Sequence, residues 1–339
     1  MDKSKALNKL VLQPSYMQSL SAIRKLNLTI TQSSKIEDFN LSSSEFPQHG
    51  NIKLIEDLQS VNLDPINGQN IASEYLYSAY DESKFKYSAL EGCAYFTSHT
   101  IVTTNKKEYI PVTYLSFYFY TRSKDITHLS PYFRYAEDPE IASNYDYLED
   151  RGSIITNWIQ DNSIALIDGP LIGGNLSSYT ISLVDQLHKK NVIPIFCVKN
   201  SDSNLLTNYI PQLKSKFNSD MHWSYNFLKV GQRTSCVLYI DEHNPRNAKV
   251  FCYLKAFNVS PQRIEFHVDT FSSYKDKIND ILNMVYYLIL VQGDRKNPQV
   301  RPIAIAEKYS REVLKATNSY YLIKSSGLVP TMNQERFGS

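Results

Sequence analysis

The sequence predicts an α/β protein built on a mixed sheet that helices flank. Residues 163–174, SIALIDGPLIGG, contain an apolar run that ends at Asp168, which is typical of a fully buried strand. Residues 177–190 follow with helical spacing, and residues 192–198 form a second apolar run. This order predicts a strand, helix, strand unit with a parallel crossover. Residues 87–121 are rich in aromatic and β-branched side chains, which favours further, half-exposed strands.

The composition is that of a globular protein with a large core. The 339 residues are 42% hydrophobic, which allows one large domain or two ordinary ones. A net charge of +2 excludes a strongly basic arm, so any contact with nucleic acid would come from a local patch. The N-terminal segment has no apolar core of signal-peptide length, and the longest late apolar run, residues 281–291, is too short to span a bilayer. We therefore expect a soluble, cytoplasmic protein.

The cysteines support a reducing environment. They lie far apart, and the chain contains no C-x-x-C pair. This spacing favours buried thiols over a disulfide framework or a zinc site. The four positions are Cys93, Cys197, Cys236 and Cys252.

The remaining elements follow from hydrophobic spacing and turn residues. Residues 1–35 predict one or two helices interrupted by Pro14, and the polar residues 42–70 predict a connector. Further along we expect strands at 87–104, 109–121, 234–240, 249–257 and 263–270, helices at 148–160, 204–217, 274–291 and 302–317, and irregular structure at 125–145. These patterns divide the chain into an N-terminal helical arm and connector at 1–75, a main domain at 76–322 and a flexible tail at 323–339.

Acidic residues fall where several of these elements would meet. Glu91 lies in the first strand region, Glu149 lies in the helix before the central strand, and Asp168 ends that strand. Glu307, in the last long helix, is a fourth candidate. An enzyme that cleaves phosphodiesters needs two divalent cations about 4 Å apart, held by carboxylates from converging elements. The sequence therefore predicts a metal site at one edge of the sheet.

Each of these residues also has a structural interpretation. Asp168 can cap the helix that follows it, and Glu149 can stabilise a helix N-terminus through the helix dipole. Glu91 can be a strand-end surface acid, and Glu307 can pair with Arg301 or Arg311 on the same helix. Lys199, which closes the strand expected at 192–198, is a further candidate and can also be a solvated lysine.

The order of these motifs resembles the NurA nucleases, which are ribonuclease-H-like partners of the HerA translocase. The resemblance covers roughly residues 87–313, and its most specific pieces are IALIDGPLIGG, IPIFCVKNSDS and RPIAIAEKYSREV. It implies a ribonuclease-H-like mixed sheet flanked by helices, with an N-terminal helical arm and C-terminal helices packed on the sheet.

The resemblance also implies roles for individual residues. Glu91 matches the first metal-binding acid, Glu149 or the adjacent Asp150 the second, and Asp168 the third. Lys199 matches a lysine that ends the next strand and would contact a phosphate. Glu307 matches the late polar residue of the YP...AH/AD motif. The resemblance therefore implies that Mn²⁺ or Mg²⁺ is held by Glu91, Glu149, Asp168 and Glu307.

The function that the resemblance implies is that of a metal-dependent deoxyribonuclease. It would act as a single-strand endonuclease and a 5′ to 3′ exonuclease in DNA end resection. A homodimer would work with a HerA-like hexameric ATPase on DNA. The chain has no G-x-x-x-x-G-K-[ST] loop of its own and no G-x-S-x-G nucleophile motif, so neither ATP hydrolysis nor serine hydrolase chemistry is expected.

The sequence departs from the family pattern in two motifs. Glu91-Gly92-Cys93 stands where the family has DGS, and Gln299 falls at the position of the tyrosine in the last motif. These departures leave a second hypothesis open, a catalytically degenerate NurA-like subunit that binds DNA or the translocase without cutting. A third is an unrelated structural or interaction protein whose partner surface includes residues 125–145.

Overall fold

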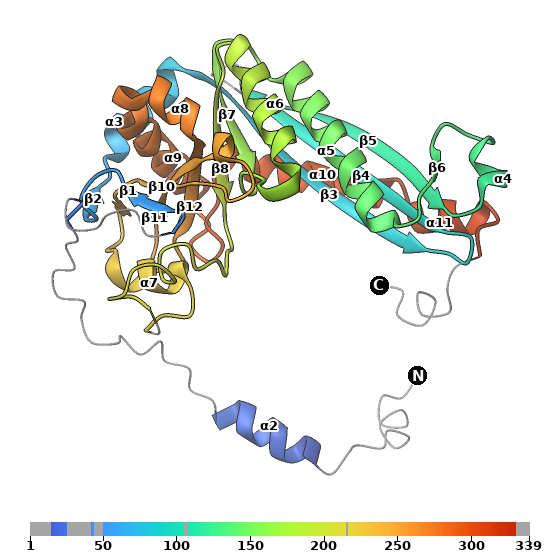
Figure 1. The fold of residues 1–339 in the computed structure, drawn as a ribbon, viewed down its shortest axis with the longest axis horizontal. Coiled ribbons are helices and arrows are strands. Elements are labelled where there is room, and N and C mark those ends of the chain that lie inside the picture. The colour runs from blue at the N-terminus through green and yellow to red at the C-terminus, as the bar shows by residue number, and fades with distance from the viewer. Residues whose placement is uncertain (1–14, 26–41, 44–49, 105–107, 215, 330–339) are drawn as a thin grey trace. The chain divides into compact units, whose positions relative to one another are not determined.

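The computed structural model describes residues 15–25, 42–43, 50–104, 108–214 and 216–329 (Figure 1). The chain forms two compact units, Met1–Glu37 and Asp38–Ser339. In the first unit the described residues form one helix, α2 (Ser15–Lys25), none of whose residues is buried. The other residues of the predicted N-terminal helices lie outside the described part of the chain.

The second unit contains a mixed sheet of twelve strands. Its main path runs in the order β1-β10-β11-β12-β8-β7-β3-β4-β5-β6, and β2 and β9 join it beside β11. The strands are β1 (Ile52–Leu54), β2 (Ser60–Asn62), β3 (Leu76–Ser88), β4 (Cys93–Thr104), β5 (Tyr109–Thr121), β6 (Phe133–Tyr135), β7 (Ser163–Asp168), β8 (Ile193–Val198), β9 (Gln232–Thr234), β10 (Val237–Tyr239), β11 (Lys249–Lys255) and β12 (Gln262–His267).

Five strands at the centre of the sheet define the fold. β3, β4 and β5 pair antiparallel in succession, whereas β7 pairs parallel to the other edge of β3 and β8 pairs parallel to β7. The order β5-β4-β3-β7-β8, with helices between β5 and β7 and between β7 and β8, is that of a ribonuclease-H-like core. The predicted fold class is therefore confirmed.

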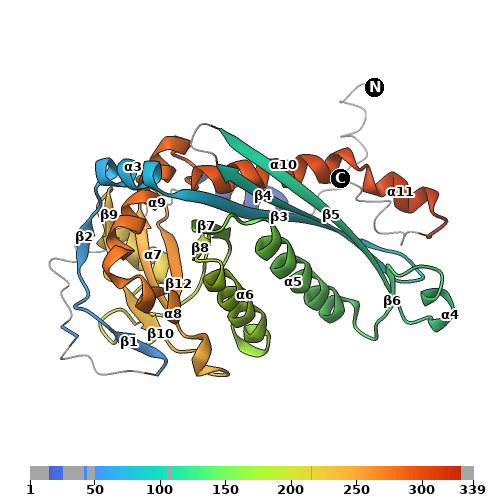
Figure 2. The same ribbon diagram turned by 90° about the horizontal axis from the view of Figure 1, so that it is seen from above.

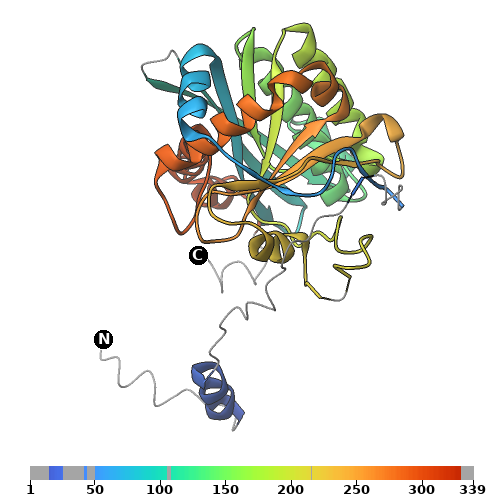
Figure 3. The same cartoon turned by 90° about the vertical axis from the view of Figure 1, so that its left-hand side faces the viewer.

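Helices cover both faces of this sheet (Figures 2 and 3). α5 and α6 lie on one face, where Ala165 and Ile167 of β7 share a core with them. α3, α9 and α10 lie on the other face, where Ile164 and Leu166 pack. The helices of the second unit are α3 (Pro65–Glu74), α4 (Lys124–Thr127), α5 (Pro139–Trp158), α6 (Ser177–Lys189), α7 (Asp220–Phe227), α8 (Val268–Ser273), α9 (Ile278–Gln292), α10 (Arg301–Ala316) and α11 (Ser319–Ser325), with 3₁₀ turns η1 (Gly174–Leu176), η2 (Pro245–Asn247) and η3 (Lys275–Lys277).

The membrane prediction can be checked on these helices. None of those in the described ranges has the length and hydrophobicity that a bilayer crossing requires.

Several predicted boundaries were wrong. The expected strand at 87–104 is two strands, because β3 ends at Ser88 and a turn leads to β4 at Cys93. α5 begins at Pro139, inside the segment expected to be irregular, because Asp138 accepts hydrogen bonds from the backbone N–H groups of Glu140 and Ile141 and caps the helix.

The helix expected at 204–217 was also wrong. The described residues of this segment form turns. Pro211 interrupts the helical hydrogen bonds, and the buried Asp220 carboxylate instead accepts the backbone N–H groups of Leu206 and Thr207. Part of the segment predicted as a connector at 42–70 is ordered too, since it contains β1, β2 and the first turns of α3.

The packing of α3 on α9 depends on a glycine. A Cβ atom at Gly68 would lie 2.1 Å from the backbone oxygen of Asn283 on α9. The two helices therefore approach more closely than a side chain at position 68 would allow. Gly152, in the middle of α5, has no neighbouring heavy atom within 4 Å of the equivalent position.

Substitution of these two glycines should have opposite effects. Gly68→Ala should lower the free energy of unfolding by about 1–3 kcal/mol, because the backbone of α9 must move. Gly152→Ala is the matched control and should raise it by about 0.5–1 kcal/mol, because alanine favours the helix. Denaturant titration measures both values, and equal effects would show that the close approach of α3 and α9 is not required.

Candidate active site

Two aspartates lie next to each other on the central parallel strands. The pairing of β3 with β7 places Tyr80 opposite Ile167, so the next residues along each strand are Asp81 and Asp168. Side chains alternate between the faces of a strand, and Ala79 packs in the core on the α9 side. Asp81 and Asp168 therefore both point to the face that α10 covers.

Burial and the charges of neighbouring acids raise the pKa of both carboxylates. Burial, followed by the charges of Asp168 and Glu82, raises the pKa of Asp81 to about 8. Burial also raises the pKa of Asp168, against the opposing effect of Lys199. The Asp168 Oδ1 atom is buried and has no hydrogen-bond partner among the described residues. Lys199 opposes both shifts without cancelling them, so the pKa of each aspartate stays above its ordinary value.

A lysine and a glutamate complete the cluster. Lys199, which follows β8, has its Nζ atom 3.5 Å from Asp168 Oδ2 and 2.8 Å from Glu307 Oε2 on α10. Arg311, one turn further along α10, also contacts the Glu307 carboxylate. Burial raises the pKa of Glu307, but Lys199 and Arg311 outweigh this effect, and the net pKa lies below the ordinary value. The structure thus brings three predicted residues together, namely Asp168, Lys199 and Glu307.

The structure places Glu91 away from this cluster. Glu91 lies in the turn between β3 and β4, where its carboxylate accepts a hydrogen bond from the Val329 backbone N–H. At about 3.3 Å per residue, the stretch of β3 from Asp81 to Ser88 alone separates them by at least about 20 Å. Gly92, which suggested a functional motif, is required by the turn. Its φ is 158°, and a Cβ atom there would lie 2.1 Å from the Tyr120 backbone oxygen.

The two predicted acids on α5, Glu149 and Asp150, also point elsewhere. Glu149 is exposed and lies close enough to raise the pKa of Tyr179 on α6, although burial is the larger cause. Asp150 accepts a hydrogen bond from the Tyr118 hydroxyl of β5 at 3.1 Å. Near the end of β7, α5 instead presents Arg151, which is 5% exposed and donates to the Asp168 backbone oxygen at 3.3 Å.

Asp81 and Arg151 are not among the residues predicted from the sequence. Residues 76–81, LYSAYD, resemble IALID in that a mostly apolar run precedes an aspartate, and this signal was available. The burial of Arg151 has no such signal, because an arginine in an amphipathic helix is ordinarily exposed.

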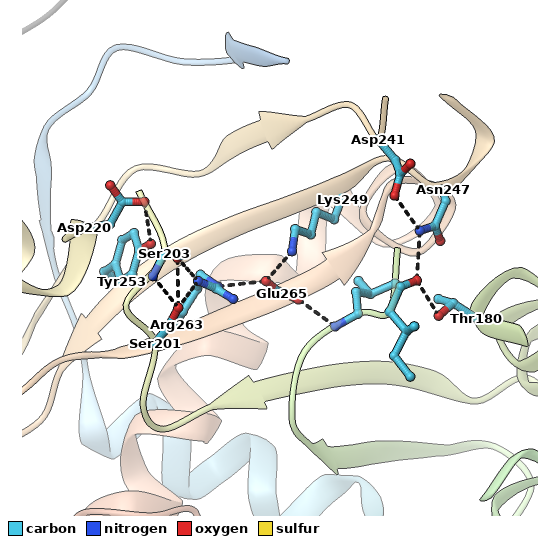
Figure 4. Close-up of polar contacts among 12 residues, drawn as sticks. Thr180, Ser201, Ser203, Asp220, Asp241, Asn247, Lys249, Tyr253, Arg263 and Glu265 are labelled. Atoms are coloured by element: carbon cyan, nitrogen blue, oxygen red, sulfur yellow. Dashed lines mark hydrogen bonds and ion pairs between the residues drawn. The ribbon is translucent and has the colours of Figure 1, made fainter. Parts of the chain in front are cut away.

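The loop that follows Asp168 is held by a buried ionic network (Figure 4). Gly169 has a φ of 90°, which turns the chain away from β7. Two residues later, the Leu171 backbone N–H donates to Glu265 Oε2 at 2.7 Å. Glu265 is fully buried, and both Lys249 and Arg263 lie 2.7 Å from its Oε1 atom. The network thus fixes the position of the loop that directly follows Asp168.

The chemistry of the cluster suits one divalent cation. No group of three or more His, Cys, Asp and Glu side chains among the described residues is arranged as a complete metal site. Mg²⁺ is commonly bound through one or two carboxylates together with waters and substrate phosphates. Asp81 and Asp168, with the unpartnered Oδ1 atom of Asp168, fit that requirement. Glu307 is less available as a ligand, because its carboxylate already pairs with the side chains of Lys199 and Arg311.

The strand order and the paired aspartates define a ribonuclease-H-like α/β domain with an acidic candidate active site. Residues 156–312 match the family model described as the NurA domain. This segment of the chain is therefore a NurA domain, which confirms the predicted resemblance. Asp81 precedes the matched residues, whereas Asp168, Lys199 and Glu307 lie within them.

Comparison with solved structures gives similarities at low sequence identity. The NurA nuclease from Sulfolobus solfataricus is 12% identical, with 96% of this chain and 98% of that chain covered and a TM-score of 0.49. A structure of NurA with manganese is 9% identical, with 71% and 88% covered and a TM-score of 0.37. Ciona intestinalis endonuclease V in complex with DNA is 13% identical, with 72% and 87% covered and a TM-score of 0.33. No curated protein sequence matches the chain.

Removal of Glu265 tests the network beneath the Asp168 loop. Glu265→Ala should lower the free energy of unfolding by about 3–5 kcal/mol, because it leaves the buried Arg263 and the partly buried Lys249 without their counter-charge. Glu312→Ala, which removes an exposed ion pair with Lys315, is the control and should change it by less than about 0.5 kcal/mol. Chemical denaturation measures both, and comparable losses would contradict a special role for the buried network.

Proposed function

We propose that this protein is a metal-dependent deoxyribonuclease whose active site is formed by Asp81, Asp168, Lys199 and Glu307. The observation that carries the proposal is the pair of carboxylates on adjacent parallel strands, the buried Asp81 and the partly buried Asp168, of which Asp168 lies in the NurA domain beside a lysine. Buried acids that repel each other are costly to keep in a fold. Their retention is explained if a cation and a phosphate complete the site.

In the proposed site each residue has a distinct role. Asp81 and Asp168 would hold Mn²⁺ or Mg²⁺, which when bound lowers the pKa of the attacking water and neutralises charge on the leaving oxygen. Lys199 would donate to a non-bridging phosphate oxygen. Glu307 would orient the Lys199 ammonium through their 2.8 Å contact. Glu91 and Glu149 are left out of the proposed site, since neither contacts it.

Asp81 also resolves one departure from the family pattern. The residues Asp81-Glu82-Ser83 contain the aspartate and the serine of the DGS motif that the resemblance leads us to expect. On this assignment the first metal-binding acid is an aspartate, as in the family. The Glu91-Gly92-Cys93 segment is then a turn and provides no argument for a degenerate site.

The finer aspects of the function follow from the family. We propose single-strand endonuclease and 5′ to 3′ exonuclease action on DNA in end resection, by a homodimer that works with a HerA-like hexameric ATPase. We also propose a cytoplasmic location, because all four cysteines are free thiols, as is usual in a reducing compartment.

A second candidate function is a NurA-like subunit that binds DNA or its translocase without cutting. The observation that favours it is Arg151. α5 presents this cation, and no carboxylate, to the Asp168 backbone. A site that needs a third acid from this helix would be incomplete.

Cleavage assays distinguish the two functions. End-labelled single- and double-stranded DNA should be cut in Mn²⁺ or Mg²⁺ and remain intact in EDTA. Asp81→Asn and Asp168→Asn should each reduce the rate by about a hundredfold or more, because each removes charge that stabilises the reacting phosphate and metal. Glu91→Gln and Glu149→Gln are matched controls and should retain the wild-type rate. Loss of cleavage in the controls, with full activity in Asp81→Asn, would refute the assignment of Asp81.

Metal binding should also be visible without any reaction. Mn²⁺ at a hundred times its dissociation constant should stabilise the wild-type fold by about 2.7 kcal/mol. Asp168→Asn should respond much less, whereas Glu149→Gln should respond like the wild type. Thermal unfolding with and without Mn²⁺ measures the difference. Equal shifts in all three proteins would mean that the cation binds elsewhere.

A further inference from the structure

The outward face of α10 carries a row of cations next to the candidate site. Lys308, Arg311 and Lys315 are exposed and recur at helical spacing, so they share the side of α10 opposite Ala306 and Ser310, which are buried against the sheet. We call these three residues the basic stripe. Arg311 contacts Glu307, so the stripe begins at the edge of the Asp168 cluster.

The stripe has little opposing charge. α10 contains two acids, and Glu307 is turned inward to Lys199. Glu312 pairs with Lys315 at 3.3 Å, but both side chains are about two thirds exposed, so this contact is easily exchanged. Lys308 makes no ion pair with any other described residue. The result is an excess of positive charge on a chain whose overall net charge is only +2.

The other face of the central sheet has the opposite character. α5 bears four acids and a single cation, the buried Arg151. The acids are Glu140, Asp146, Glu149 and Asp150. Glu140 pairs with Lys86 and Asp146 with Arg134, so α5 itself offers no exposed cation to a polyanion, whereas α10, on the side where the paired aspartates lie, offers three.

We propose that the basic stripe binds the phosphates of single-stranded DNA and guides that strand to the Asp81 and Asp168 site. The proposal rests on the proposed nuclease function and adds the path of the substrate to it. Lys308 and Lys315 are two helical turns apart, about 10 Å, so they can contact different phosphates of one strand. A single row of cations on a convex helix suits a flexible strand, which can follow it, better than a rigid duplex.

The dependence of binding on salt tests this directly. Binding of a labelled single-stranded oligonucleotide in EDTA is measured by fluorescence anisotropy over a series of NaCl concentrations. Each phosphate contact contributes about 0.7 to the slope of log K against log salt, so Lys308→Ala/Lys315→Ala should reduce the slope by about 1.4. Arg311 is kept, because it touches Glu307.

The control removes the same charge elsewhere. Lys189→Ala/Lys275→Ala changes two exposed lysines, one of them on α6 on the opposite face of the sheet, and should leave the slope unchanged. Lys308→Arg/Lys315→Arg should restore the wild-type slope, because it restores the charge. Thermal unfolding of each variant confirms that the exposed substitutions leave the fold intact.

Three results would overturn the proposal. These are a wild-type slope in Lys308→Ala/Lys315→Ala, an equal loss in the control, and a wild-type protein that binds duplex DNA or RNA of the same sequence more tightly than single-stranded DNA. The nuclease function is tested separately. If the slope falls as expected but no protein cuts DNA in Mn²⁺, the stripe is a DNA-binding surface and the proposed catalysis is wrong.

Discussion

The parallel pairing of β3 with β7 is the constraint on which the candidate site depends. It sets Asp81 beside Asp168 on one face of the sheet, and the adjacent strand β8 delivers Lys199 to the same place. Any slip of one residue in this register would turn Asp81 to the α5 face and separate the carboxylates. The apolar residues on both faces of β7 resist such a slip, because each packs in a defined core.

The outer half of the sheet supports this arrangement from one side. β12 pairs with β8 and carries Glu265, whose buried carboxylate binds Lys249, Arg263 and the Leu171 backbone N–H. On the other side of the strand end, Arg151 donates to the Asp168 backbone oxygen. Buried ions are an expensive way to hold a loop, and their value here is the fixed direction that they impose. The Asp168 main chain is thus restrained from two directions.

Sequence reasoning predicted the residues that follow strong apolar runs. Asp168 ends a buried strand and Glu307 lies on a regular amphipathic helix, so the hydrophobic pattern located both. Lys199 follows a buried strand as well, and the family resemblance marked it as a site residue. Asp81 was not predicted because β3 continues for seven residues beyond it. The second half of the strand is partly exposed, so the sequence does not show a distinct apolar run that ends at Asp81. A carboxylate in the middle of a strand does not look like one at its end.

Other features depend on tertiary contacts that no local pattern reveals. The exposure of Glu149 and the burial of Arg151, two residues apart on one helix, are decided by the rotation of α5 against the sheet. Glu91 was assigned to a strand because the turn at residues 89–92 has only Gly92 to mark it. The segment 204–217 has helical spacing, but Asp220 satisfies its backbone in another way.

The separation of Asp81 and Asp168 along the chain has a consequence for biosynthesis. The meander of β3, β4 and β5 uses local hairpin contacts, whereas β7 pairs with β3 only after the whole of α5 has been made. Contacts between distant segments form late, because the entropy of closing the loop must be overcome first. A nascent chain that ends before β7 therefore contains one carboxylate without the other, and the paired aspartates are assembled only after β7 has joined β3.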